Sequence, residues 1–317
     1  MSIGDGFGHR LYVPAFTRRA STSTHAILGE HQRGGLSKMK SILVPFRDDE
    51  TARSAVAAAC AVAKQFSSHI EGLFIQTPPL VYASEGIAIG GYVTQLADEE
   101  KRRADEAQVR FRELMAAQNV TMDDVSLETR PNASWQQVDG LSEQIVGEYG
   151  RLFDLIAIGR ETKNASPDWS VMCESALFDS GRLILLASPT LPSTMGEVIS
   201  ILWNGSTETA NTIAMSMPFL AAAKEVKVLC VTGVSVPGPS GEQIAKSLSL
   251  HGIPTSVITT DIGDRTPGEA VLEDAYSSGA DLLLKGAYAN SRLRQMIFGG
   301  PTRQILSSTE LPVLMGH

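Results

Sequence analysis

The sequence has few cysteines and no long apolar run. Its three cysteines, Cys60, Cys173 and Cys230, are far apart and form no Cys-x-x-Cys pair, so a disulfide framework is not expected. No apolar stretch approaches the ~18–20 residues that span a bilayer. The first segment also lacks the apolar core of a secretory signal. These absences predict a soluble, cytoplasmic protein that does not contact a membrane.

Positive charge is also scarce: 27 Lys and Arg stand against 35 Asp and Glu, a net charge of −8. Residues 1–38 contribute five basic and two acidic side chains, or +3, which leaves −11 for the rest. Nucleic-acid surfaces need clustered Lys and Arg, so no nucleic-acid partner is expected. The six histidines show no metal-ligand spacing, and no metal site is predicted.

Motifs of catalysis are absent as well. The sequence has no Walker A loop, no nucleophile elbow and no His-Glu-x-x-His pair, so an enzyme is the least supported class. Cys60 and Cys230 lie in apolar segments and are expected in the core. Cys173 lies beside a predicted loop and is a candidate for an exposed thiol. Asp48 and Asp49 are interpreted as partners of a helix dipole, not as paired catalytic carboxylates.

What the chain does contain is 43% hydrophobic residues over 317 positions, enough for two domains with cores of their own. Residues 1–38 are rich in Gly, Ser, Thr and Arg without periodicity, which predicts a disordered N-terminal extension. Residues 188–194 (SPTLPST) are typical of a linker. The predicted domains are therefore 39–190 and 191–317.

Strands and helices alternate through both domains, the pattern of parallel α/β folds. A long apolar loop over 78–92 interrupts the first domain; it is either packed over the sheet edge or a lid or partner-docking surface. The predicted strands are 41–45, 69–75, 122–130, 153–158 and 183–187, then 198–203, 226–231, 255–260, 281–285 and 312–315. The predicted helices are 48–66, 94–119, 134–149 and 170–181, then 207–223, 240–251, 267–278 and 300–308.

The two domains repeat one pattern. Residues 44–49 (VPFRDD) align with 201–206 (ILWNGS), and 154–159 (DLIAIG) align with 281–286 (DLLLKG). The repeat predicts two doubly wound α/β units, each a parallel five-stranded sheet with helices on both faces and right-handed crossovers.

Ligands of open parallel sheets bind beyond the carboxyl ends of the strands. In the second domain two loops lie there, 204–206 and 286–302. The second loop ends in glycines at a helix start, where free amides and the helix dipole attract phosphate. The alternative is plain turn chemistry, with Asn204 and Ser206 as helix caps.

Residues 39–317 resemble the universal stress protein family in its tandem-domain form. The most specific motifs are ILWNGS (201–206), DLLLKGAYANSRLRQMIFGGPTRQIL (281–306) and LPVLM (311–315). The resemblance implies an adenine-nucleotide α hydrolase-like fold with sheet order 3-2-1-4-5. It also implies that the last strands, 183–187 and 312–315, pair within the chain as in a pseudo-dimer, which covers their edges. The chain either stays so or pairs again as a homodimer.

Some members of that family bind ATP through a Gly-x2-Gly-x9-Gly-Ser/Thr loop and an acidic residue after the first strand, and others have lost the site. Here Ala289 and Gly300 depart from the loop pattern, and Asn204 replaces the acidic residue. In the first domain, Arg47 takes the acidic position and no such loop follows Gly159, so no nucleotide is expected there. The candidate binding residues are Asn204, Gly205, Ser206, Gly286, Arg292, Gly299, Gly300 and Thr302.

Two hypotheses about function follow from this resemblance and its departures. One is a stress-response binding module whose second domain weakly holds ATP or another adenine nucleotide. The other is a nucleotide-free scaffold that acts through protein–protein contacts. A slow ATPase is a third, weaker hypothesis.

Overall fold

The computed structural model describes residues 39–77, 89–123, 130–161, 169–190, 193–233, 235–287 and 309–317. The predicted extension 1–38, most of the predicted loop 78–92 and the predicted helix 300–308 lie outside these ranges. Residues 89–92, which the sequence analysis places in that loop, belong instead to a helix that begins at Ile89.

The first half of the chain follows the predicted alternation of strands and helices, except around residues 122–149. Asp49 caps the first helix, because its Oδ1 accepts the Thr51 amide hydrogen at 2.8 Å. Of the predicted strand 122–130, residues 124–129 lie outside the described ranges, and Met122 ends a two-residue strand. The predicted start of the helix 134–149 is wrong, because an eight-residue strand occupies 132–139 and the helix begins only at Ser142. The elements are β1 (Ser41–Pro45), α1 (Glu50–Phe66), β2 (His69–Gln76), α2 (Ile89–Ala117), β3 (Thr121–Met122), β4 (Asn132–Asp139), α3 (Ser142–Gly150), β5 (Leu155–Gly159), α4 (Trp169–Asp179) and β6 (Leu183–Ala187).

The second half matches its predicted elements closely where the structure describes them. The predicted helix 207–223 is divided at Ser216, since Pro218 lacks the amide hydrogen that a continuous helix needs. Capping boxes at Ser240 and Thr266 begin two of the helices. The elements are β7 (Val198–Trp203), α5 (Thr207–Met215), α6 (Met217–Ala222), β8 (Glu225–Val231), α7 (Gly241–Leu250), β9 (Thr255–Thr260), α8 (Pro267–Ser277), β10 (Leu282–Gly286) and β11 (Val313–Gly316).

The strands form one sheet of 11 strands, in the order β3-β4-β2-β1-β5-β6-β11-β10-β7-β8-β9. All neighbours are parallel except β6 and β11, which pair antiparallel with Leu185 opposite Leu314. The α/β class and the pairing of the two last strands are thus confirmed. That pairing joins the two predicted sheets into one, and the first half has a sixth strand, the two-residue β3, beyond the five predicted.

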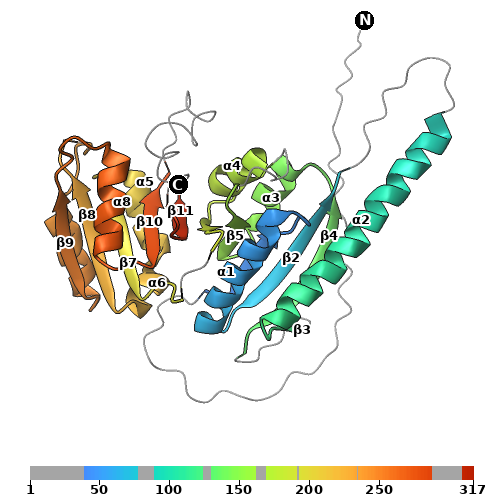
Figure 1. The fold of residues 1–317 in the computed structure, drawn as a ribbon, viewed down its shortest axis with the longest axis horizontal. Helices are drawn as coiled ribbons and strands as arrows, with labels where there is room; N and C mark the ends of the chain where they lie inside the picture. The colour runs from blue at the N-terminus through green and yellow to red at the C-terminus, as the bar shows by residue number, and fades with distance from the viewer. Residues whose placement is uncertain are drawn as a thin grey trace, which may run out of the picture. The chain divides into compact units, whose positions relative to one another are not determined.

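Helices cover both faces of this sheet, as Figure 1 shows for each half. Successive strand residues point to opposite faces, so Leu282 and Leu284 of β10 enter one apolar layer and Leu283 enters the other. The first layer packs under α1, α2, α5 and α7, and the second under α3, α4 and α8. Among the described helices, none combines the length and the apolar character needed to cross a bilayer.

Equivalent aspartates, Asp154 before β5 and Asp281 before β10, bind the backbone where the first strand of each half starts. Asp281 Oδ1 accepts the amide hydrogens of Gly196 at 2.9 Å and Val198 at 3.1 Å, and its Oδ2 accepts that of Glu197 at 3.1 Å. Asp154 Oδ2 accepts two amide hydrogens in front of β1 in the same way. The predicted repeat therefore extends to the hydrogen bonds that fix where β1 and β7 start.

Candidate binding site at the carboxyl edge of the second half

The loop after β7 is built as the start of α5. Asn204 Oδ1 accepts the amide hydrogen of Ser206 at 3.2 Å and the hydroxyl hydrogen of Thr209 at 3.0 Å. Ser206 caps the helix, because its Oγ accepts the Thr209 amide hydrogen at 3.2 Å. The carboxamide oxygen of Asn204 is therefore engaged within the loop.

Gly205 lets the loops after β7 and β8 lie backbone against backbone. Its φ of +87° is in the region that favours glycine, and a Cβ there would lie 2.7 Å from the Val236 carbonyl oxygen. The Val236 amide hydrogen bonds to the Asn204 carbonyl oxygen at 2.9 Å. Both the backbone angle and the space thus require glycine at this position.

Gly286 ends β10 directly against the first turn of α5. A Cβ at Gly286 would lie 2.4 Å from the Thr209 amide nitrogen. Gly159 makes the same approach in the first half, where a Cβ would lie 2.2 Å from the Thr51 carbonyl oxygen. Because the first half lacks the nucleotide motif, close packing of strand on helix explains this glycine in both halves.

The structure brings together four of the eight candidate residues: Asn204, Gly205, Ser206 and Gly286 meet around the start of α5. The other four, Arg292, Gly299, Gly300 and Thr302, lie outside the described residues. In the first half, Arg47 stands where Asn204 stands in the second, and its Nη2 donates to Ser142 Oγ at 2.9 Å. The two halves therefore differ chemically at the same place in the fold.

Sequence reasoning missed Lys285, which precedes Gly286 in β10. Its side chain is only 7% exposed, and burial lowers its pKa to about 8. Its ammonium donates to the Gly286 carbonyl oxygen at 3.0 Å. The available signal was a single lysine at the end of an otherwise apolar strand, LLLKG.

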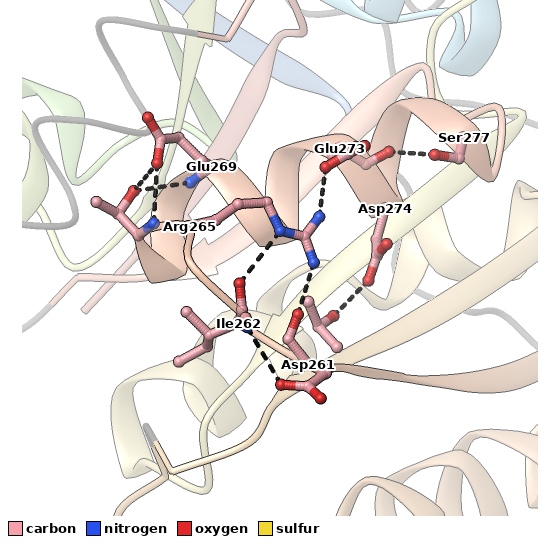
Figure 2. Close-up of polar contacts among 10 residues, drawn as sticks. Asp261, Ile262, Arg265, Glu269, Glu273, Asp274 and Ser277 are labelled. Atoms are coloured by element: carbon pink, nitrogen blue, oxygen red, sulfur yellow. Dashed lines mark hydrogen bonds and ion pairs between the residues drawn. The ribbon is translucent and has the colours of Figure 1, made fainter.

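The loop from β9 to α8 lies at the same carboxyl edge and is closely hydrogen-bonded. Arg265 donates to the carbonyl oxygens of Ile262 at 3.2 Å and Asp261 at 2.6 Å, and it pairs with Glu273, as Figure 2 shows. Hydrogen bonds from Thr266 lower the pKa of Glu269 at the start of α8. The Arg265 guanidinium therefore holds its own loop in place.

The three cysteines carry no feature of a reactive site. Cys60 and Cys173 are buried, and burial raises the pKa of the Cys60 thiol to about 12 and that of Cys173 well above its usual value. Cys230 is partly buried against the core, and its pKa is also raised. Cys60 thus lies in the core as predicted, whereas the suggestion of an exposed Cys173 is wrong. Within the described ranges, no group of three or more His, Cys, Asp or Glu side chains is placed to hold a metal ion.

Comparison with known proteins gives likenesses in structure only. No family model matches the chain, and no curated protein matches its sequence. A universal stress protein from Archaeoglobus fulgidus DSM 4304 superimposes with a TM-score of 0.64 at 15% identity, over 87% of this chain and 95% of that one.

Two further solved structures are less similar overall. A putative universal stress protein from Pseudomonas aeruginosa UCBPP-PA14 has a TM-score of 0.47 at 17% identity, covering 88% of this chain and 93% of that one. A universal stress protein solved in complex with cAMP has a TM-score of 0.35 at 12% identity, covering 49% of this chain and all of that one. The Archaeoglobus match spans both halves, so the chain has the fold of a universal stress protein over most of its length.

Proposed function

We propose that this chain acts as a universal stress protein, a binding module whose second half holds ATP or another adenine nucleotide weakly. The observation that supports it most is the meeting of the 204–206 loop, the end of β10 and the first turn of α5 at one carboxyl edge. Edges of this kind are where doubly wound folds bind ligands. The cytoplasm remains the predicted location.

The start of α5 supplies the part of the site that attracts phosphate. Amides in the first turn of a helix lack intrahelical acceptors and carry the positive end of the dipole. Gly286 lets β10 end within contact of this turn. In the proposal, Arg292, Gly299, Gly300 and Thr302, which follow β10 in the sequence, complete the phosphate site.

We expect the proposed site to bind nucleotide weakly because of the chemistry of Asn204. An amide carries no charge to strengthen a hydrogen bond to a ribose hydroxyl, and its oxygen already accepts two hydrogen bonds from the α5 turn. Within the part of the chain that the structure describes, this leaves the side-chain amide nitrogen of Asn204 for a ligand.

A second candidate function is a scaffold without nucleotide. It is supported by the equivalence of Gly159 and Gly286, since packing alone accounts for the glycine that opens the proposed loop. On this alternative the carboxyl edge keeps its shape for reasons of folding, and the protein acts through contacts with other proteins.

One experiment separates the two functions. Protein purified without added ligand is denatured, and released nucleotide is identified and quantified per chain by mass spectrometry. ATP and Mg²⁺ are then titrated calorimetrically into the emptied protein. Bound nucleotide, or saturable binding that Arg292→Ala weakens and Arg103→Ala does not, supports the proposed site. Arg103 is a matched control because it is an exposed arginine on α2 of the first half.

If no nucleotide is released and the titration gives no heat of binding, the result supports the scaffold function instead. Phosphate release is followed in the same samples. Release above buffer that needs Mg²⁺ and is lost in Arg292→Ala would instead establish a slow ATPase.

A further inference from the structure

A second cluster of polar side chains lies in the first half, at the amino ends of β2 and β4. In the register of this parallel pair, His69 is opposite Asn132 and Glu71 is opposite Ser134. These four side chains alternate with core positions and share the face on which Leu73 enters the layer under α3 and α4. We call them, with Tyr149 of α3, the His69 cluster. The cluster lies at the amino ends of strands of the first half, whereas the proposed nucleotide site lies at the carboxyl ends of β7 and β10 in the second half.

His69 connects two members of the cluster through its two ring nitrogens. Nδ1 lies 2.5 Å from Asn132 Oδ1, and Nε2 lies 2.8 Å from Ser134 Oγ. An amide oxygen only accepts, so this contact places a hydrogen on Nδ1; in the neutral imidazole, Nε2 is then the acceptor that faces the serine hydroxyl. A hydroxyl, a base and a group that orients the base is the arrangement that activates serine nucleophiles on unrelated folds.

Glu71 places a carboxylate beside the Ser134 hydroxyl. Its Oε2 accepts from Ser134 Oγ at 3.5 Å, a longer contact than the 2.8 Å from this hydroxyl to His69 Nε2, and its Oε1 accepts the Tyr149 hydroxyl hydrogen at 2.6 Å. Burial and the bond to Glu71 raise the pKa of Tyr149, so this hydroxyl stays a neutral donor. A carboxylate so close to the serine repels anionic acyl donors and tolerates neutral or cationic ones.

The second half shows the same backbone positions without this chemistry. Glu225 opposes Val198 as His69 opposes Ser41, and Lys227 opposes Ser256 as Glu71 opposes Ser134. Lys227 pairs with Glu225, and Ser256 Oγ is buried with no hydrogen-bond partner among the described residues. Ser256 is therefore a serine in the equivalent strand position that has no histidine beside it.

We propose that Ser134 is a nucleophile activated by His69 and that it accepts an acyl group from a neutral or cationic ester. Ser134 Oγ forms a bond to the carbonyl carbon, and the bond from that carbon to the ester oxygen breaks. The hydroxyl proton passes to His69 Nε2 and then to the departing alkoxide. The products are an acyl-serine and the free alcohol.

The test uses the full chain and p-nitrophenyl acetate as the probe. Release of p-nitrophenolate gives the acylation rate, intact mass gives the number of acetyl groups, and peptide mass spectrometry locates them. The expected result is one acetyl group on Ser134 of the wild-type protein. Acetylation elsewhere, or none, overturns the proposal without any variant.

Variants then assign the roles. Ser134→Ala removes the labelled site, and Ser256→Ala leaves the rate unchanged. His69→Gln lowers the rate by about 100-fold or more, the usual contribution of a general base. Circular dichroism checks that each variant is folded. A folded His69→Gln variant that acetylates Ser134 at the wild-type rate would show that the serine is not activated by His69.

Discussion

At the scale of single residues, the charge on Lys285 has the clearest consequence. Burial lowers its pKa from 10.5 to about 8, so the folded state favours the neutral amine. Between these two values the unfolded chain binds more protons than the folded one, and stability therefore rises as pH rises through this window. Below about pH 8 the lysine destabilises the fold by roughly 3 kcal/mol relative to a neutral group.

The prediction is that Lys285→Met removes this part of the pH dependence. We expect urea unfolding free energies of wild type and variant to differ most near pH 7 and to converge toward pH 10. Comparing the two proteins cancels other groups that titrate in this range. A constant difference across pH would contradict the buried, destabilising lysine.

Asn204 is the residue whose replacement tests the nucleotide proposal most directly. Asn204→Asp keeps an oxygen that can accept from Ser206 and Thr209 and adds the missing charge. If a ribose hydroxyl lies here, a charge-assisted bond should tighten ATP binding by about 1 kcal/mol, or roughly fivefold. Calorimetric titration measures it, and Asp261→Asn, which removes a negative charge from another loop of the same edge, shows how far an opposite change of net charge alone shifts binding.

The sequence alone could identify residues that act locally, but not residues that are brought together by the pairing of strands. Asn204 and Ser206 could be identified as cap residues because caps are local. The contact between His69 and Ser134 could not be found, since it depends on the register of β2 on β4. Moreover, the segment that contains Ser134 was predicted as a helix.

At the scale of elements, the start of β7 depends on Asp281. Its buried carboxylate accepts three backbone amide hydrogens, and Asp281→Asn removes one of the two accepting oxygens. A buried amide left without an acceptor costs about 1–3 kcal/mol. We expect a loss of this size in urea unfolding free energy. Asp261→Asn, which affects an exposed bond to Gly263, should change it by much less.

Most elements could be predicted because apolar runs and helix caps are signals contained in short stretches of the sequence. β4 could not, because its strand form depends on eight residue pairs with β2 that lie more than 60 positions away along the chain. Its sequence, NASWQQVD, alternates too weakly in hydrophobicity to predict a strand by itself. Pro218, by contrast, was a local signal for the break between α5 and α6 that the prediction of one helix overlooked.

At the scale of the whole described chain, Arg160 connects the two halves beyond the pairing of β6 and β11. It follows β5, is buried, and its guanidinium donates to the carbonyl oxygens of Thr309 and Leu311, the latter at 2.6 Å. Arg160→Ala leaves both carbonyl groups without this donor and opens a cavity, which should cost about 2–4 kcal/mol. Arg182→Ala is the matched control, because Arg182 is more exposed and bonds within its own half to the Arg151 carbonyl oxygen.

Urea unfolding followed by two probes, Trp fluorescence and circular dichroism, measures this loss. We expect the Arg160→Ala midpoint to fall clearly below that of Arg182→Ala. Equal midpoints for the two variants would show that the contact adds nothing to the joint between the halves.

The antiparallel pairing of β6 with β11 also determines how the protein responds to dilution. Two separate chains that met through such strands would dissociate as their concentration fell. Here both strands belong to one polypeptide, and the short connection from β6 to β7 keeps the local concentration of the two halves on the order of millimolar whatever the number of copies in the cell. The continuous sheet therefore persists at low abundance, and the two halves can differ in sequence, with Asn204 in one and Arg47 at the equivalent position of the other, while the pairing of β6 with β11 is kept.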